Sequence, residues 1–190
     1  MREIARAAGI TTPVLYDHFP SKRDLQIALL EEQESNLRAH QGSERELGPG
    51  PELARALIGD FFSWVEGHPS AWRMLFHDAP TDVEVLAAQR RLRARSVAQI
   101  SSFVALAPEL RTTGGLGREA LAEILGTSIY AVVNDLAAWW FEHPEVPREE
   151  LVDVAYGLLW PGLAAFAPPP DRASWGADSS GTETNDLHKS

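Results

Sequence analysis

The chain has 190 residues, of which 44% are hydrophobic and 23% charged, a balance typical of a soluble globular protein. It has no cysteine, which excludes disulfides, thiolate catalysis and zinc-thiolate sites, and no uninterrupted apolar run reaches the roughly 18 residues of a membrane span, so we expect a cytoplasmic protein. The net charge is −10, but residues 1–25 carry four basic and three acidic side chains, so any contact with DNA phosphates is confined to that end.

Two short helices are predicted within residues 1–25, which we call the headpiece. The first begins at Arg2 and ends at Gly9, because glycine readily adopts the left-handed conformation common at helix C-termini. Thr12 is the predicted N-cap of the second helix and Pro13 its first residue. Two short helices joined by a turn of about three residues predict a helix-turn-helix, whose second helix enters the major groove of DNA.

The second helix is predicted to bury one face. Leu15 and Phe19 lie four residues apart and are expected to pack inward with Ile4 of the first helix. The side chains left on the outer side are Thr12, Pro13, Tyr16 and Asp17.

A third helix is predicted at about residues 22–39. Ser21 opens it, with Asp24 three residues later in a capping-box-like pattern. The exposed amides at this helix start, beside Lys22, are suited to hold a DNA phosphate.

The run IARAAGITTPVLYDHFPSKRDL, residues 4–25, resembles the TetR-family signature, a small helix-turn-helix followed by Tyr-x-His-Phe-x-Ser/Asn-Lys-x-x-Leu. The matching residues are Tyr16, His18, Phe19, Ser21, Lys22 and Leu25. The resemblance implies contacts to bases or nearby backbone from Arg2, Thr11, Thr12, Pro13 and Val14, and contacts to phosphates from Tyr16, His18 and Lys22. For Tyr16 and His18 the competing interpretation is a pair of half-exposed surface side chains. For Lys22 it is a solvated charge at a helix start.

In that family a further helix precedes the one that begins here at Arg2 and closes the headpiece core. We therefore expect the true start to lie upstream of Met1 and to restore this helix. Without it, Ile4, Leu15 and Phe19 would each lose part of about 1.5–3 kcal/mol of burial, which would leave the headpiece loose.

The remainder is predicted to be helical, which makes the chain all-α. The expected body helices lie at about residues 52–67, 70–78, 82–107, 117–142 and 148–166. Residues 1–40 form the predicted DNA-binding domain with its connecting helix, and residues 52–167 a ligand-binding and dimerisation domain. A loop at 41–51 joins them, and the tail at 168–190, rich in Pro, Ser and Gly, is predicted to be disordered.

The helices at 52–67 and 70–78 are rich in aromatic residues. The family resemblance implies a small-molecule pocket in this bundle, suited to a planar or apolar effector. The candidate lining residues are Phe61, Trp64, Trp72 and Phe76, with His77 and Asn134 as polar groups. The competing interpretation is that these side chains simply belong to the core or the surface.

The last two helices carry long apolar stripes, and Pro161 is expected to kink the second of them. The resemblance implies that they pair with their copies in a four-helix dimer interface. The candidate interface residues are Leu125, Ile129, Leu151, Val154, Leu158 and Gly162. An intramolecular core is the competing interpretation.

Together these features predict a ligand-responsive DNA-binding transcription regulator: a repressor that binds a palindromic operator as a homodimer and is released by a small apolar or aromatic effector. The alternative is a dimeric helical protein that binds a small molecule or a partner but not DNA, because its headpiece is incomplete. We predict no catalytic residue, metal site or cofactor. The segment GGLGREA, residues 114–120, mimics a dinucleotide-binding turn but does not follow a credible strand.

Overall fold

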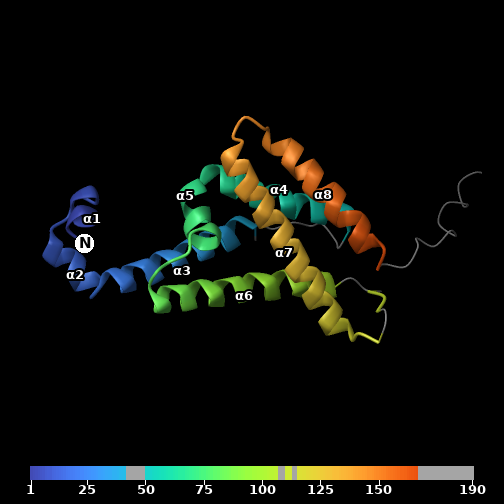
Figure 1. Cartoon of the computed structure of the whole chain (residues 1–190), viewed down its shortest axis with the longest axis horizontal. Coiled ribbons are helices and arrows are strands. Elements are labelled where there is room, and N and C mark those ends of the chain that lie inside the picture. The colour runs from blue at the N-terminus through green and yellow to red at the C-terminus, as the bar shows by residue number, and fades with distance from the viewer. Residues whose placement is uncertain (42–49, 107–109, 113–114, 167–190) are drawn as a thin grey trace, which may run out of the picture.

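The computed structural model describes residues 1–41, 50–106, 110–112 and 115–166 (Figure 1). Within these ranges every regular element is a helix, which confirms the all-α class. In chain order the helices are α1 (Arg2–Ala7), α2 (Thr12–His18), α3 (Lys22–Gln41), α4 (Pro51–Gly67), α5 (Pro69–Trp72), the π-helix η1 (Arg73–His77), α6 (Val83–Ala105), α7 (Arg118–Glu142) and α8 (Arg148–Ala164). The predicted loop at 41–51 is shorter at both ends, because Gln41 still belongs to α3 and Pro51 begins α4, and its residues 42–49 lie outside the described residues, as does the predicted tail at 168–190.

The turn between α1 and α2 agrees with the sequence in one respect and differs in another. Gly9 has φ of 69°, the left-handed conformation expected of it. The N-cap of α2, however, is Thr11 in extended conformation, and its side chain makes no capping hydrogen bond. Thr12 is already helical, so its prediction as the N-cap was wrong. Pro13 is accommodated in the first turn because the amides there have no helical partner to lose.

The described headpiece buries Ala5, Leu15 and Leu25. Ile4 is 37% exposed and Phe19 half-buried, so within the described headpiece neither is covered as fully as Leu15, in line with the partial loss of burial expected for them. Ala5, with its small side chain, is the residue that α1 buries.

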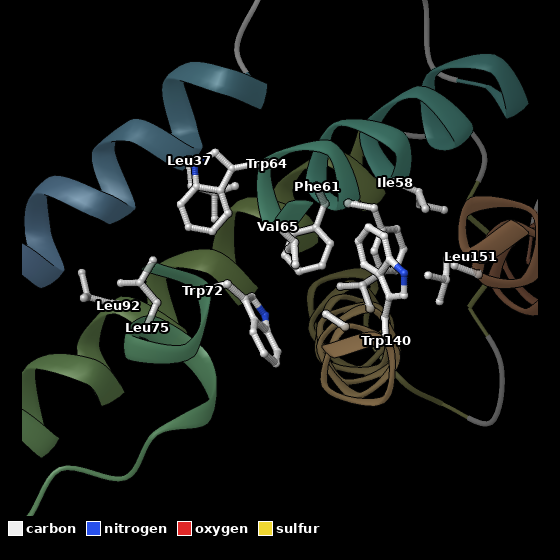
Figure 2. Close-up of a cluster of buried hydrophobic side chains, with 14 of the residues drawn as sticks. Leu37, Ile58, Phe61, Trp64, Val65, Trp72, Leu75, Leu92, Trp140 and Leu151 are labelled. Carbon is white, nitrogen blue, oxygen red and sulfur yellow. The ribbon is translucent and has the colours of Figure 1, made fainter. Parts of the chain in front are cut away.

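The body helices enclose one main core. In Figure 1, α3 leads from the headpiece into the body, α6 runs beneath it, α7 crosses α6, and α8 lies along α4. Trp64 and Trp72 are almost fully buried in this core (Figure 2). Trp140 meets Phe62 edge to face at 6.0 Å between ring centroids. Large rings supply much buried apolar area per residue, which stabilises the bundle.

The π-helix η1 is tied to α6 by one side chain. The amide of Gln89 donates to the carbonyl oxygens of Met74 at 2.6 Å and Asp78 at 2.9 Å. These carbonyls lie at the end of a wider helical turn, where backbone groups need partners from outside. Gln89 therefore fixes the position of η1 on α6.

Helix α7 is long and apolar enough to cross a bilayer, with a mean hydropathy of 1.2 over 18 residues of which a third are buried. It is the one such helix in the described residues, whereas the sequence prediction was that no span would be found. The sequence prediction required an uninterrupted apolar run, whereas the mean hydropathy of 18 residues can be high even when one or two charged residues interrupt the run. Core helices of globular proteins meet the same condition.

Pro161 lies inside α8, which continues to Ala164.

Candidate functional site

Helix α2 turns one face inward and the opposite face to solvent. Leu15 is 4% exposed, against the rest of the headpiece. At about 100° per residue, Pro13 and Asp17 lie nearly opposite Leu15, and Val14 and Tyr16 flank them on either side. All four of these side chains are exposed. We call them the outer face of α2, the surface that a DNA groove would meet.

The other predicted DNA-binding residues surround this face. Arg2, Thr11, His18 and Lys22 are exposed, and Thr12 is half-buried. Their side chains therefore remain available to a ligand, although their roles in DNA contact stay predictions.

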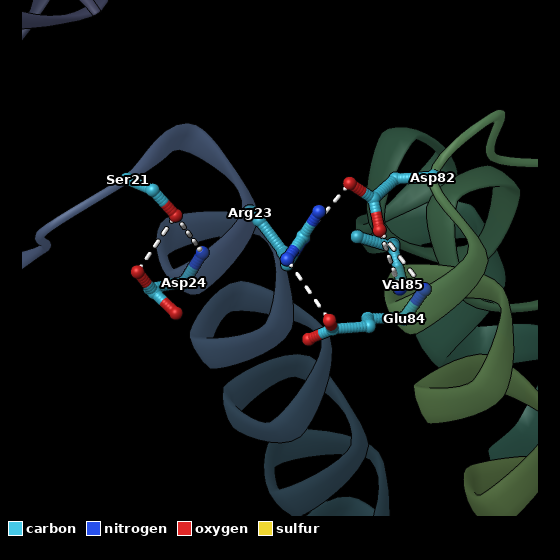
Figure 3. A network of polar contacts seen from close by, with 6 residues as sticks. All are labelled: Ser21, Arg23, Asp24, Asp82, Glu84 and Val85. Carbon is cyan, nitrogen blue, oxygen red and sulfur yellow. Dashed lines mark hydrogen bonds and ion pairs between the residues drawn. The ribbon is translucent and has the colours of Figure 1, made fainter.

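The start of α3, where Lys22 lies, is fixed by a local cap. The hydroxyl of Ser21 accepts a hydrogen bond from the Asp24 amide at 3.2 Å and donates to the Asp24 carboxylate at 2.7 Å (Figure 3). This is the capping pattern predicted from the spacing of the two residues. It sets the orientation in which Lys22 leaves the first turn.

Arg23 joins the headpiece to the body. Its guanidinium donates to Asp82 at 2.8 Å and to Glu84 at 3.0 Å, both at the start of α6 (Figure 3). The hydrogen bond and charge of Arg23 hold the pKa of Asp82 below its usual value, and hydrogen bonds from the amides of Glu84 and Val85 act in the same direction. Sequence analysis missed this contact, because nothing in a local pattern relates side chains 59 residues apart.

Four of the six predicted effector residues come together where α5 and η1 meet α7. The indole N–H of Trp72 donates to the side-chain oxygen of Asn134 at 3.2 Å, and Trp72 stacks on His77 at 5.6 Å between ring centroids. Phe76 meets Tyr130 edge to face at 6.0 Å, and the Asn134 amide donates to the Tyr130 carbonyl oxygen at 2.9 Å. We call these five residues the aromatic layer. Burial raises the pKa of the Tyr130 hydroxyl, while Arg93 opposes this shift.

The other two predicted effector residues, Phe61 and Trp64, lie elsewhere in the core. Phe61 packs on Phe62, and Trp64 stacks on His68 at 5.3 Å between ring centroids. Figure 2 shows where Phe61 and Trp64 lie in the core. The indole N–H of Trp64 is buried and has no hydrogen-bond partner among the described residues. The six residues therefore do not line one common site.

Two open grooves on the described surface have other linings. One lies between α4 and α8 and is strongly charged, with Glu52, Arg55, Arg148 and Glu149 on its walls. The second is lined by Gln33 of α3 and by residues 67–71 and Met74. Neither groove includes any of the predicted effector residues, so the assignment of those residues to a ligand site stays a prediction.

The predicted dimer residues fall into three classes. Val154 and Leu158 of α8 are 52% and 62% exposed, and Gly162 is also exposed. Leu125 and Ile129 of α7 are half-buried. Leu151 is only 3% exposed, within the main core. Its side chain is therefore unavailable to a second chain, and the core interpretation holds for this residue.

Comparison with known protein families gives two matches that together cover most of the chain. Residues 1–29 match the N-terminal family described as bacterial regulatory proteins, tetR family, and residues 49–174 match the tetracyclin repressor-like C-terminal domain. The HTH-type transcriptional activator FasR of Mycolicibacterium smegmatis is 25% identical over 166 residues, which cover 86% of this chain and 73% of that protein.

Proposed function

Because the chain belongs to the TetR family, and is therefore a DNA-binding transcription regulator, we propose that it binds a palindromic operator as a homodimer and that a small-molecule effector changes this binding. Such a protein acts in the cytoplasm, where the DNA is. The proposal has three parts, which are the DNA interface, the dimer surface and the effector response.

The observation that carries the DNA interface is the outer face of α2. Burial of Leu15 on the opposite side holds this face outward, and Lys22 lies exposed just beyond the end of the helix. The whole chain carries a net charge of −10, whereas residues 1–25 carry four basic against three acidic side chains, so the headpiece is the part that we propose contacts phosphates. We propose that Tyr16, His18 and Lys22 contact phosphates, while Arg2, Thr11, Thr12, Pro13 and Val14 lie at or near base edges.

The test is the salt dependence of binding to duplex DNA selected from a random library. Loss of one phosphate contact in Lys22→Ala should lower the affinity and reduce the slope of log K against log salt by about 1. Arg91→Ala removes the same charge from an exposed site on α6 and should leave the slope unchanged. Absence of binding by the wild-type chain would favour the alternative, a helical dimer that does not bind DNA.

Exposed apolar side chains on α7 and α8 support the dimer. Val154 and Leu158 on α8 and Ile124 on α7 are each at least half exposed, and large exposed apolar side chains are candidates for an interaction site. A twofold dimer of this kind presents two headpieces to two half-sites, which makes the operator palindromic.

We propose that a planar, apolar effector binds at the aromatic layer and pushes η1 away from α7. Gln89 ties η1 to α6, and Asp82 and Glu84 at the start of the same helix bind Arg23, so a movement of η1 would reach the headpiece through α6 and these two sets of polar contacts. An effector that favours the shifted arrangement would lower the affinity for DNA.

Thermal-shift screening of aromatic compounds tests the effector. A ligand that binds only the folded protein raises the melting temperature, and a Trp72→Ala variant should lose this response. Compounds that stabilise the wild-type chain should then be added to the DNA-binding assay. If none of them changes the affinity for DNA, the effector part of the proposal is wrong.

The direction of regulation has two candidates. We propose repression, in which the bound dimer blocks transcription until the effector releases it. Activation is the second candidate, since the relative FasR is described as an activator. A reporter gene placed under the selected operator distinguishes them: deletion of this protein raises expression under repression and lowers it under activation.

A further inference from the structure

Asp17 occupies the centre of the outer face of α2. It lies about 200° around the helix from Leu15, the residue that α2 buries. Pro13, one turn earlier, shares this central position but has no side-chain hydrogen-bonding group. If α2 lies in the major groove, Asp17 is therefore the polar side chain that points most directly at the base edges.

Nothing in the described structure gives Asp17 a role in stability. It is exposed, and no hydrogen bond or ion pair joins its side chain to any residue that the structure describes. It also lies in the last turn of α2, where the free carbonyls carry partial negative charge and disfavour a carboxylate. A residue that breaks a local rule without a visible structural gain is a candidate for function.

An acidic side chain at this place also weakens binding to DNA in general, because it faces a polyanion. The unfavourable charge is offset when the carboxylate accepts a hydrogen bond from a base. A carboxylate only accepts hydrogen bonds. In the major groove, cytosine offers the N4 amino donor, whereas adenine places the N7 acceptor beside its amino group, and guanine presents two acceptors.

We propose that Asp17 is a specificity-determining residue that accepts a hydrogen bond from the N4 amino group of one cytosine in each operator half-site. This inference rests on the proposed function, in which α2 enters the major groove. Asp17 contributes discrimination between bases at one position, while the phosphate-binding residues supply the general affinity.

The experiment selects operators from a randomised duplex library with the full-length wild-type chain and with Asp17→Asn, Asp17→Ala and Glu31→Gln. The wild-type chain should prefer cytosine at one position of each half-site, by roughly five- to hundredfold over other bases. Asp17→Asn should prefer adenine at that position, because a carboxamide pairs with adenine N6 and N7. Asp17→Ala should show no preference there, and both variants should bind random DNA more tightly.

Glu31→Gln is the matched control, since it removes the same charge from an exposed site on α3. It should select the wild-type operator. Thermal unfolding distinguishes a role in DNA recognition from a role in stability. Both Asp17 variants should melt at or above the wild-type temperature, because each substitution removes an unfavourable negative charge from the C-terminal end of α2.

Two results would overturn the inference. If the Asp17 variants select the same bases as the wild-type chain at every position, Asp17 does not read the operator, although the proposed function stands. If they instead melt lower and lose all selectivity, the role of Asp17 is structural. Failure of the wild-type chain to enrich any sequence would overturn the proposed function, and this inference with it.

Discussion

The guanidinium of Arg23 donates from Nε to the Asp82 carboxylate at 2.8 Å, which joins the first turn of α3 to the start of α6. The other carboxylate oxygen of Asp82 accepts hydrogen bonds from the amides of Glu84 at 2.9 Å and Val85 at 3.4 Å. One side chain thus caps a body helix and binds the helix that leaves the headpiece. The position of the headpiece is therefore coupled to the integrity of the α6 cap.

The Arg23–Asp82 contact should open in acid. Because Arg23 lowers the pKa of Asp82, the contact stabilises the fold above the ordinary aspartate pKa, and this contribution is lost as the pH falls through the lowered value. In Arg23→Gln the pKa of Asp82 should rise toward its ordinary value. A carboxyl-detected NMR titration measures this shift, with Arg91→Gln as the control. An unchanged titration of Asp82 in Arg23→Gln would contradict the coupling.

Gly126 permits the close crossing of α6 and α7. A Cβ atom at this position would lie 2.9 Å from the backbone nitrogen of Ser101 and would also collide with its hydroxyl. Gly126→Ala should therefore lower the free energy of unfolding by about 1–3 kcal/mol, because the backbone of α6 must shift. Gly59→Ala on α4 meets no atom within 4 Å and should instead stabilise by up to about 1 kcal/mol. Urea denaturation of both variants gives the comparison, and equal effects would refute the steric explanation.

Leu158 is 62% exposed on α8 and belongs to the proposed dimer surface. Leu158→Lys should convert the dimer to a monomer, because a charged side chain would be buried between two copies of the helix. Val83→Lys, at a 78% exposed site on α6, should leave the oligomeric state unchanged. Sedimentation velocity measures both. A dimer that persists in Leu158→Lys would place the interface on another surface.

Asn134 supplies the hydrogen-bond acceptor for the buried indole of Trp72. Asn134→Ala leaves this N–H without a partner and should cost about 1–3 kcal/mol of stability. Ser128→Ala on the same helix removes an exposed hydroxyl, whose bond to the Ile124 carbonyl oxygen water can replace, and should change stability by less than about 0.5 kcal/mol. In the Asn134→Ala background, Trp72→Phe should cost less than in the wild-type chain, because the donor no longer has an acceptor to lose. If Trp72→Phe costs as much in the Asn134→Ala background as in the wild-type chain, measured by thermal unfolding, the hydrogen bond contributes little to stability.

Features set by residues close in the sequence could be predicted. The outer ends of the body helices lie within two residues of their predicted positions, because apolar spacing and end signals act within one or two turns, but the single helix predicted at 70–78 is α5 followed by the π-helix η1. The Ser21 cap of α3 was also predictable, because its partner Asp24 lies three residues away. The family signature in the headpiece has the same local character, which is why the resemblance was visible from about two dozen residues.

Only the tertiary structure decided which side of each helix is covered. Periodicity placed Leu151 and Leu158 on apolar stripes, but packing against α4 buries the first and leaves the second exposed. Likewise, Arg23 had no local feature to distinguish it from other surface cations, and its partners are brought near by the path of the chain through three intervening helices. The sequence by itself determined the helices, the family and the outer face of α2, because these depend on neighbours along the chain. Which helices meet, and hence how the body reaches the headpiece, depended on burial and on contacts between distant residues.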